Sequence, residues 1–101
     1  MTYTRVAPAV DVADGAKKAY EVAGRSVLVC HAEGRWYAVS NLCSHAAEKL
    51  ECGQMRRGWI SCPAHGARFE LATGRAMNAP AKQPIATYPV RIADEWIEIL
   101  V

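Results

Sequence analysis

The fold of this chain is decided by the stretch CSHAAEKLECGQMRRGWISCPAH at residues 43–65. It opens with Cys43 and His45, which one residue separates, and closes with Cys62 and His65, which two residues separate. Thiolate and imidazole groups are both good ligands for transition metals. One Cys and one His in each of two loops therefore predict a metal site held between two similar loops.

Two kinds of metal site fit these four residues. With a single residue between them, Cys43 and His45 can reach different metal atoms, so both thiolates can bind one iron of a 2Fe-2S cluster and both imidazoles the other. A tetrahedral zinc ion also accepts two Cys and two His. Zinc fingers usually pair Cys with Cys and His with His, whereas each loop here mixes them. The residues favour a 2Fe-2S cluster at Cys43, His45, Cys62 and His65, with structural zinc as the competing interpretation.

The remainder of the chain predicts β-strands. Its 101 residues are 51% hydrophobic and 22% charged, which is typical of one globular domain. Short runs rich in Val, Tyr, Leu and Trp, separated by turn residues, predict strands. These runs are Thr2–Ala7, Lys18–Val22, Ser26–His31, Arg35–Val39, Ile85–Ile92 and Glu95–Val101, with brief pieces at Trp59–Ser61 and Arg68–Leu71 and a hairpin turn at Ala93–Asp94. The pattern predicts a single all-β domain over residues 1–101, an antiparallel sandwich or open barrel with a two-loop cluster-binding subdomain inserted at roughly residues 41–84.

The net charge and the N-terminal sequence argue against several classes of partner and location. The net charge of +2 is too small to indicate a nucleic-acid or membrane partner. No apolar run approaches the length of a membrane-spanning helix, and Met1–Pro8 lacks the profile of a secretory signal. We therefore expect a cytoplasmic protein, in which thiols stay reduced. The segment from Cys43 to Lys82 holds six basic and three acidic residues, which predicts a mildly positive face.

The other candidate residues receive structural interpretations. Cys30 lies in an apolar run and is expected to pack in the core, and Cys52 is expected to be a free thiol in a loop. His31 does not repeat the ligand spacing and is left out of the site. The three tryptophans sit in strand-like runs and are expected in the core; they are Trp36, Trp59 and Trp96.

The two motifs and the residues after them, GARFELATGRA at 66–76, resemble the Rieske iron-sulfur family, and more narrowly the Rieske-type ferredoxins of bacterial aromatic-ring-hydroxylating dioxygenases. The resemblance covers nearly the whole chain. It implies that Cys43 and Cys62 bind the buried iron and that His45 and His65 bind the outer iron. It also implies that a loop containing Pro80 closes over the cluster.

The same resemblance implies a function and a subtype. It implies a monomeric one-electron carrier, without catalysis of its own, between a flavin-containing NAD(P)H reductase and a terminal oxygenase. A small Rieske subunit of another complex, such as an assimilatory nitrite reductase, is the alternative. Respiratory Rieske proteins have a disulfide and hydroxyl donors at positions where this chain has Ala47, Ala64, Ala67 and Phe69. Without those donors, we expect a reduction potential below about 0 mV, toward the low end of the Rieske range.

Overall fold

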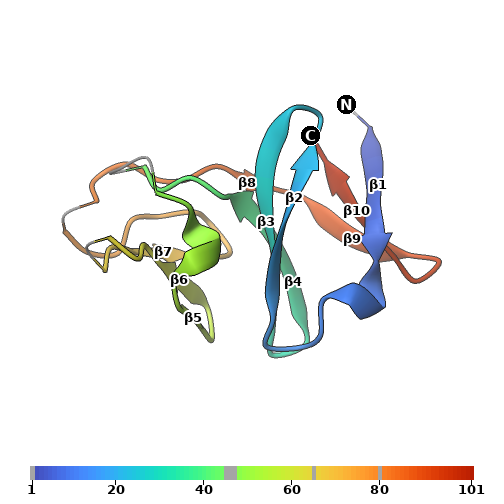
Figure 1. Cartoon of the computed structure of the whole chain (residues 1–101), viewed down its shortest axis with the longest axis horizontal. Helices are drawn as coiled ribbons and strands as arrows, with labels where there is room; N and C mark the ends of the chain where they lie inside the picture. Colours follow the sequence, from blue (N-terminus) through green and yellow to red (C-terminus); the bar gives the residue numbers. More distant parts are fainter. Residues whose placement is uncertain (1, 45–47, 65, 80) are drawn as a thin grey trace.

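The structure of this protein is a computed structural model that describes residues 2–44, 48–64, 66–79 and 81–101. Short strands make up about half of it (Figure 1). The strands are β1 Tyr3–Pro8, β2 Lys17–Val22, β3 Arg25–Ala32, β4 Arg35–Ser40, β5 Met55–Arg56, β6 Trp59–Ser61, β7 Arg68–Glu70, β8 Thr87–Tyr88, β9 Val90–Ala93 and β10 Trp96–Leu100, with single 3-10 turns η1 Ala9–Asp11 and η2 Leu50–Cys52. The predicted all-β antiparallel fold is confirmed.

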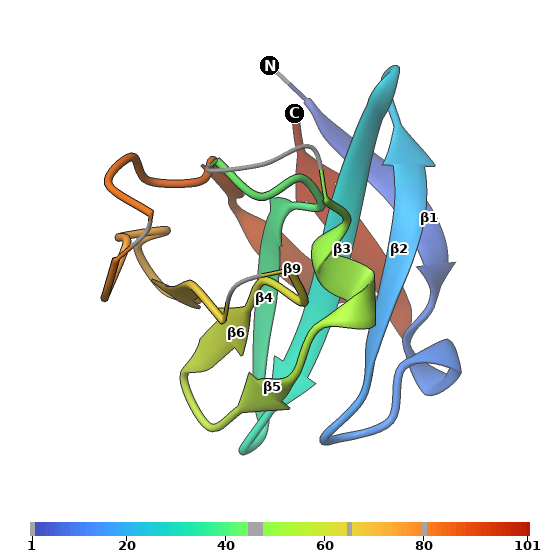
Figure 2. The same ribbon diagram turned by 60° about the vertical axis from the view of Figure 1, so that its left-hand side comes forward.

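The strands form three antiparallel sheets that lie in layers (Figures 1 and 2). The middle layer has the order β2-β3-β4-β8, and the sheet β1-β10-β9 lies against one side of it. The small sheet β5-β6-β7 belongs to residues 41–84, which lie on the other side in both views. We call residues 41–84 the loop lobe. Two buried clusters, one on each side of the middle sheet, hold the layers together.

Strand β3 explains why the middle sheet has a core on both faces. A strand with one face in solvent alternates apolar and polar residues, whereas a strand buried on both faces is a continuous apolar run. Val27 and Val29 pack in the cluster shared with β1 and β10, and Leu28 and Cys30 pack in the cluster shared with the loop lobe. All four side chains are fully buried. The loop lobe therefore rests on a rigid internal sheet, and Cys30 has the core position that was predicted.

Two details near the C-terminus correct the sequence prediction. The run Ile85–Ile92 is not one strand, because Pro89 has no N–H to donate and separates β8 and β9, which join different sheets. The hairpin turn after β9 is Asp94–Glu95, one residue later than predicted, since Ala93 pairs with Trp96 across it. Both turn residues have positive φ, 51° and 66°, as a two-residue hairpin of this type requires.

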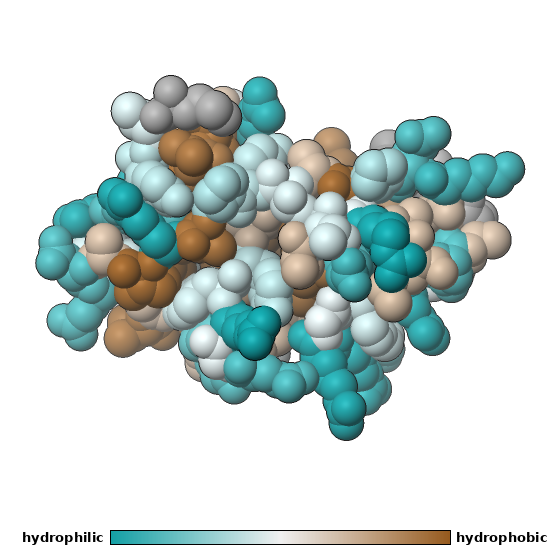
Figure 3. All heavy atoms as spheres, turned by 180° about the vertical axis from the view of Figure 1, so that it is seen from behind, coloured by the Kyte–Doolittle hydropathy of each residue, from teal (hydrophilic) through white to brown (hydrophobic). Residues whose placement is uncertain are grey.

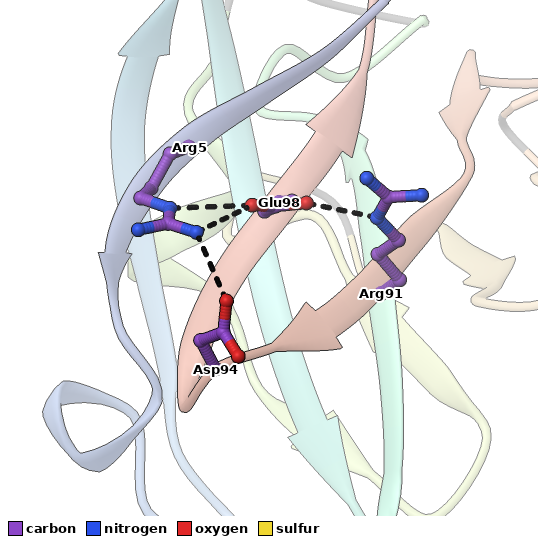
Figure 4. Close-up of polar contacts among 4 residues, drawn as sticks. All are labelled: Arg5, Arg91, Asp94 and Glu98. Carbon is purple, nitrogen blue, oxygen red and sulfur yellow. Dashed lines mark hydrogen bonds and ion pairs between the residues drawn. The ribbon is translucent and has the colours of Figure 1, made fainter.

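A buried carboxylate joins the three strands of the β1-β10-β9 sheet (Figure 4). Glu98 of β10 is 8% exposed and accepts hydrogen bonds from Arg91 Nε at 2.8 Å and Arg5 Nε at 3.2 Å. The hydrogen bonds and positive charge of Arg91 and Arg5 hold the pKa of Glu98 below its ordinary value. The two guanidinium groups also lie over aromatic rings, that of Arg91 3.9 Å from the Tyr3 centroid and that of Arg5 5.4 Å from the Trp96 centroid.

The tryptophans differ from the prediction that placed them in the core. All three are only partly buried, because each ring forms a platform at the surface. Trp36 stacks on His31 at 3.8 Å between ring centroids, Trp96 lies under Arg5, and Trp59 lies under Arg68 at 4.6 Å. None of the helices in the described part of the chain has the length and apolar character that a membrane crossing requires.

Candidate metal centre

The first ligand loop is a hairpin whose two arms are joined by backbone hydrogen bonds. Leu50 N–H donates to the carbonyl of Asn41 at 2.7 Å, and Leu42 pairs with Lys49 in an antiparallel bridge. The next rung joins the N–H of Cys43 to the carbonyl of Glu48 at 2.9 Å. Between Cys43 and Glu48 the sequence contains His45, and the structure describes Ser44 there.

The second ligand loop repeats this construction. Strands β6 and β7 end at the pair Ser61 and Arg68, and the N–H of Cys62 then donates to the carbonyl of Ala67 at 2.7 Å. Between Cys62 and Ala67 the sequence contains His65, and the structure describes Pro63, Ala64 and Gly66 there. In both hairpins the N–H of the cysteine therefore donates to the carbonyl of the residue five positions later in the sequence. The two similar loops that the sequence predicted are both present in the fold.

Gly53 brings the two loops together. A Cβ atom on this residue would lie 1.7 Å from the carbonyl oxygen of Ser61, the residue before Cys62, so only glycine fits. The exit of the first loop thus packs directly on the entry of the second. Cys43 and Cys62, 6% and 1% exposed, belong to the same buried cluster as a result. The two loops therefore place both thiol groups in one apolar region.

Asn41 fixes the position of the first loop through its side chain. The side chain is fully buried and donates from Nδ2 to Ser26 Oγ at 3.1 Å and to Glu51 Oε1 at 2.9 Å. Its Oδ1 accepts the N–H of Glu51 at 2.9 Å. A buried polar group is stable only when its hydrogen bonds are satisfied, and Asn41 meets this condition by binding both ends of the loop and strand β3. We assign Asn41 as a positioning residue for Cys43.

A third segment, residues 77–84, is attached to both loops by side chains. Ser44 Oγ in the tip of the first loop donates to the carbonyl of Gln83 at 2.5 Å. At the other end of the segment, Asn78 Oδ1 accepts the N–H of Arg68 at 2.7 Å, just after the second loop. The segment is therefore held across the pair of loops. Pro80, predicted to close over the cluster, belongs to this segment but lies outside the described residues.

Comparison with known proteins identifies this arrangement. Residues 2–89 match the Rieske [2Fe-2S] domain. The chain belongs to the Rieske family. It is 37% identical to the ferredoxin component of the naphthalene 1,2-dioxygenase system from Pseudomonas aeruginosa, over 88% of this chain and 86% of the relative. It is 32% identical to the ferredoxin component of biphenyl 2,3-dioxygenase from Rhodococcus jostii, over 91% and 86% of the two chains.

A solved Rieske structure gives the same result. The ferredoxin of carbazole 1,9a-dioxygenase from Nocardioides aromaticivorans superposes with a TM-score of 0.92 at 34% identity, over 98% of this chain and 97% of that one. These relatives confirm the predicted resemblance to dioxygenase ferredoxins and the prediction of an electron carrier without catalysis of its own. They also confirm the Rieske-type 2Fe-2S cluster as the cofactor, and they argue against structural zinc.

The described residues fit such a cluster. Two buried cysteines on matched loops would supply the soft ligands that iron in a cluster requires. Their shared cluster is apolar, with Ala67 and Phe69 fully buried at the positions where hydroxyl donors were expected to be missing. His45 and His65 lie outside the described residues, so their role as ligands stays a prediction. Among the described residues alone, no group of three metal-ligating side chains comes together.

The residues that the sequence excluded from the site have other contacts. Burial raises the pKa of the Cys30 thiol to about 12, only partly opposed by the charge of Lys17, so this residue stays protonated in the core. His31 donates from Nδ1 to the Val12 carbonyl at 3.0 Å and stacks on Trp36. Cys52 is exposed and free, as predicted. The positioning residues Asn41, Gly53, Ser44 and Asn78 were not predicted, because their partners lie elsewhere in the chain.

Proposed function

We propose that this protein carries single electrons from a flavin-containing NAD(P)H reductase to the terminal oxygenase of an aromatic-ring dioxygenase system. In this proposal Cys43 and Cys62 hold one iron of the cluster, and His45 and His65 hold the other. The bound cluster would supply a one-electron couple with a potential below about 0 mV. The chain acts in the cytoplasm as a monomer, and residues 1–101 form one domain whose cluster-binding part is roughly residues 41–84.

The observation that carries this proposal is the pair of matched hairpins with a buried cysteine at the same position of each. The chain's own residues exclude water from the thiol side of the site, since Cys43 and Cys62 are packed among apolar groups. The tips of the loops, which contain the two histidines in the sequence, start at exposed residues such as Ser44 and Pro63. A centre buried on its cysteine side and approached from its loop tips suits brief electron transfer at a small interface.

Relatives support the two proposed partners to different extents. The ferredoxins named above are components of dioxygenase systems, which contain an oxygenase by definition, and so support the acceptor. The donor is inferred from the chemistry: a one-electron carrier needs a source that can divide the hydride pair of NAD(P)H, and flavins do this. The chain would then need no substrate site of its own.

Electron transfer and ligand loss test the proposal together. The loaded protein is incubated anaerobically with NADH and the reductase of a naphthalene 1,2-dioxygenase system, and its visible spectrum is followed. We expect complete reduction by one electron per protein, and reoxidation when a terminal oxygenase is added. His65→Ala should lose the cluster spectrum, because lost ligation is also lost folding energy. The matched variant His31→Ala should keep it, since its ring contacts lie around Val12 and Trp36.

Three results would contradict parts of the proposal. A wild-type protein that takes up no electron from any flavin reductase would refute the carrier function. A full cluster spectrum in His65→Ala would remove that residue from the site. A stable stoichiometric complex with a large reductase would favour the alternative of a bound Rieske subunit over a diffusing carrier.

A further inference from the structure

Positive charge is concentrated in the loop lobe. Residues 41–84 contain six basic and three acidic side chains, whereas the rest of the chain contains six basic and seven acidic ones. The small net charge of the whole protein therefore conceals two parts of opposite sign. The view from behind shows hydrophilic side chains projecting from the lobe at the right, with apolar residues between them (Figure 3).

Among the described residues, only one of the six lobe cations lies beside a carboxylate. The carboxylate of Glu51 accepts a hydrogen bond from the buried side chain of Asn41. Glu70 accepts one from Thr73 and pairs with Arg75 at 3.8 Å. Within the described part of the chain, the five other lobe cations have no carboxylate oxygen within 4.0 Å; these are Lys49, Arg56, Arg57, Arg68 and Lys82.

Two of these cations share one face of the small sheet with a tryptophan. Arg56 pairs with Trp59, and Ser61 pairs with Arg68, so the side chains of Arg56, Trp59 and Arg68 point to the same side of β5-β6-β7. The opposite side holds Ile60 and Phe69, both fully buried in the core. This outer face therefore carries two exposed guanidinium groups beside a half-buried indole. Ser61 and Glu70 lie on the same face, and the Glu70 carboxylate pairs with Arg75 at 3.8 Å.

The Arg68 side chain is held in place on this face. Its guanidinium carbon lies 4.6 Å from the centroid of the Trp59 ring, a cation–π distance. Its backbone N–H is bound by Asn78 Oδ1 at 2.7 Å. Arg68 also occupies the last strand pair before the rung that fixes Cys62. A guanidinium stacked on an aromatic ring keeps its N–H edge free for a carboxylate.

We propose that this outer face, built on Arg56, Trp59 and Arg68, docks an acidic surface of the flavin-containing reductase. The inference rests on the proposed function and names the partner surface that it requires. Carboxylates of the reductase meet the two guanidinium groups, and the indole between them supplies an apolar contact. The two arginines then fix how the reductase lies relative to the second ligand loop.

The positive charge of this face favours the electron donor, not the electron acceptor, as the partner that docks there. Reduction adds one electron, so the oxidised protein is more positive by one unit than the reduced protein. A positive docking face therefore binds an acidic partner more tightly when the protein is oxidised. The oxidised protein is the form that meets the reductase, and the reduced protein is the form that must leave it. An acidic surface on the reductase thus favours both binding of the oxidised protein and release of the reduced protein.

The test measures binding of the loaded protein to the reductase of a naphthalene 1,2-dioxygenase system. Dissociation constants are determined at low and high salt for both redox states. The variant Arg56→Gln/Arg68→Gln is compared with Lys18→Gln/Arg25→Gln, which removes the same charge from exposed residues outside the lobe. At low salt we expect the first variant to bind about three- to tenfold more weakly and the second to bind as the wild type does. We also expect the oxidised wild type to bind about twofold more tightly than the reduced form, with the difference lost at high salt.

A redox titration of each variant separates this inference from the proposed function. One-electron titration by all variants, with weaker reductase binding only after Arg56→Gln/Arg68→Gln, supports both. Equal weakening in the two double variants would overturn the docking face, because net charge alone would then act. Weaker binding to a terminal oxygenase but not to the reductase would overturn the choice of the donor. Failure of the wild type to titrate would refute the proposed function and the docking proposal with it.

Discussion

Asn41→Ala tests how the first ligand loop is held. The substitution removes three side-chain hydrogen bonds, to Ser26 Oγ, Glu51 Oε1 and Glu51 N–H, from a fully buried position. Each hydrogen bond contributes about 1 kcal/mol, and the groups left without a partner add to the loss. We expect the free energy of unfolding to fall by about 3 kcal/mol. For a domain of this size, that corresponds to a melting temperature lower by about 12 to 24 °C.

Thermal unfolding of the cluster-loaded protein, followed by circular dichroism and by the visible spectrum, measures this effect. Ser26→Ala is the matched control, since it removes only one of the three bonds and should cost about 1 kcal/mol. Asn41→Asp keeps the acceptor for Glu51 N–H but sets a second carboxylate against Glu51 Oε1, so it should be destabilised at neutral pH and recover partly in acid. An Asn41→Ala protein that melts within a few degrees of wild type would refute the role assigned to Asn41.

Three further changes test other parts of the structure. Gly53→Ala should destabilise the loaded protein by more than about 2 kcal/mol in urea unfolding, because its Cβ would meet backbone, whereas Gly58→Ala, with no atom within 4 Å of its Cβ, should cost less than about 1 kcal/mol; equal costs would disprove the close approach. Because the pKa of Glu98 is lowered in the folded protein, its ionised form adds stability above the unfolded pKa, and this stability is lost as the pH falls through the folded pKa. Glu98→Gln should therefore be less stable than wild type at pH 7, and the difference in unfolding free energy should vanish below about pH 4. A difference that does not change with pH would contradict the ion pairs. Iodoacetamide at pH 8 should label Cys52 but spare Cys30, whose pKa is about 12, and mass spectrometry showing rapid labelling of both would disprove the burial.

Much of this architecture was predictable from local patterns. The continuous apolar run of β3 follows directly from burial on two faces. The alternation in β10 correctly placed Ile97 and Ile99 in the core, whereas Glu98 between them is also buried, because Arg5 and Arg91 bind it. The spacing of Cys43 and Cys62 with their neighbouring histidines predicted two similar loops, and the structure has two hairpins with the cysteine at the same position. The break at Pro89 agrees with the chemistry of proline, but Ile85–Ile92 was predicted as one strand, and the change of sheet depends on the partner strands.

The features that were not predicted depend on contacts between distant segments. Gly53 has an ordinary negative φ of −84°, so nothing local marks it, and it is required only because Ser61 lies against it. Asn41 looks like any polar residue after a strand until its partners at Ser26 and Glu51 are known. Trp59 reads as a core residue because it is apolar, whereas its place under an arginine follows from the pairing of β6 with β7.

Nitrogen hyperfine spectroscopy can show whether two histidines bind the cluster. The protein is produced with 15N-labelled histidine, purified without oxygen, reduced by dithionite and measured by electron nuclear double resonance. We expect a reduced 2Fe-2S signal with couplings to two histidine nitrogens, and loss of that signal in His65→Ala but not in His31→Ala. A reduced cluster without histidine couplings, or a protein that holds zinc and gives no signal, would contradict it.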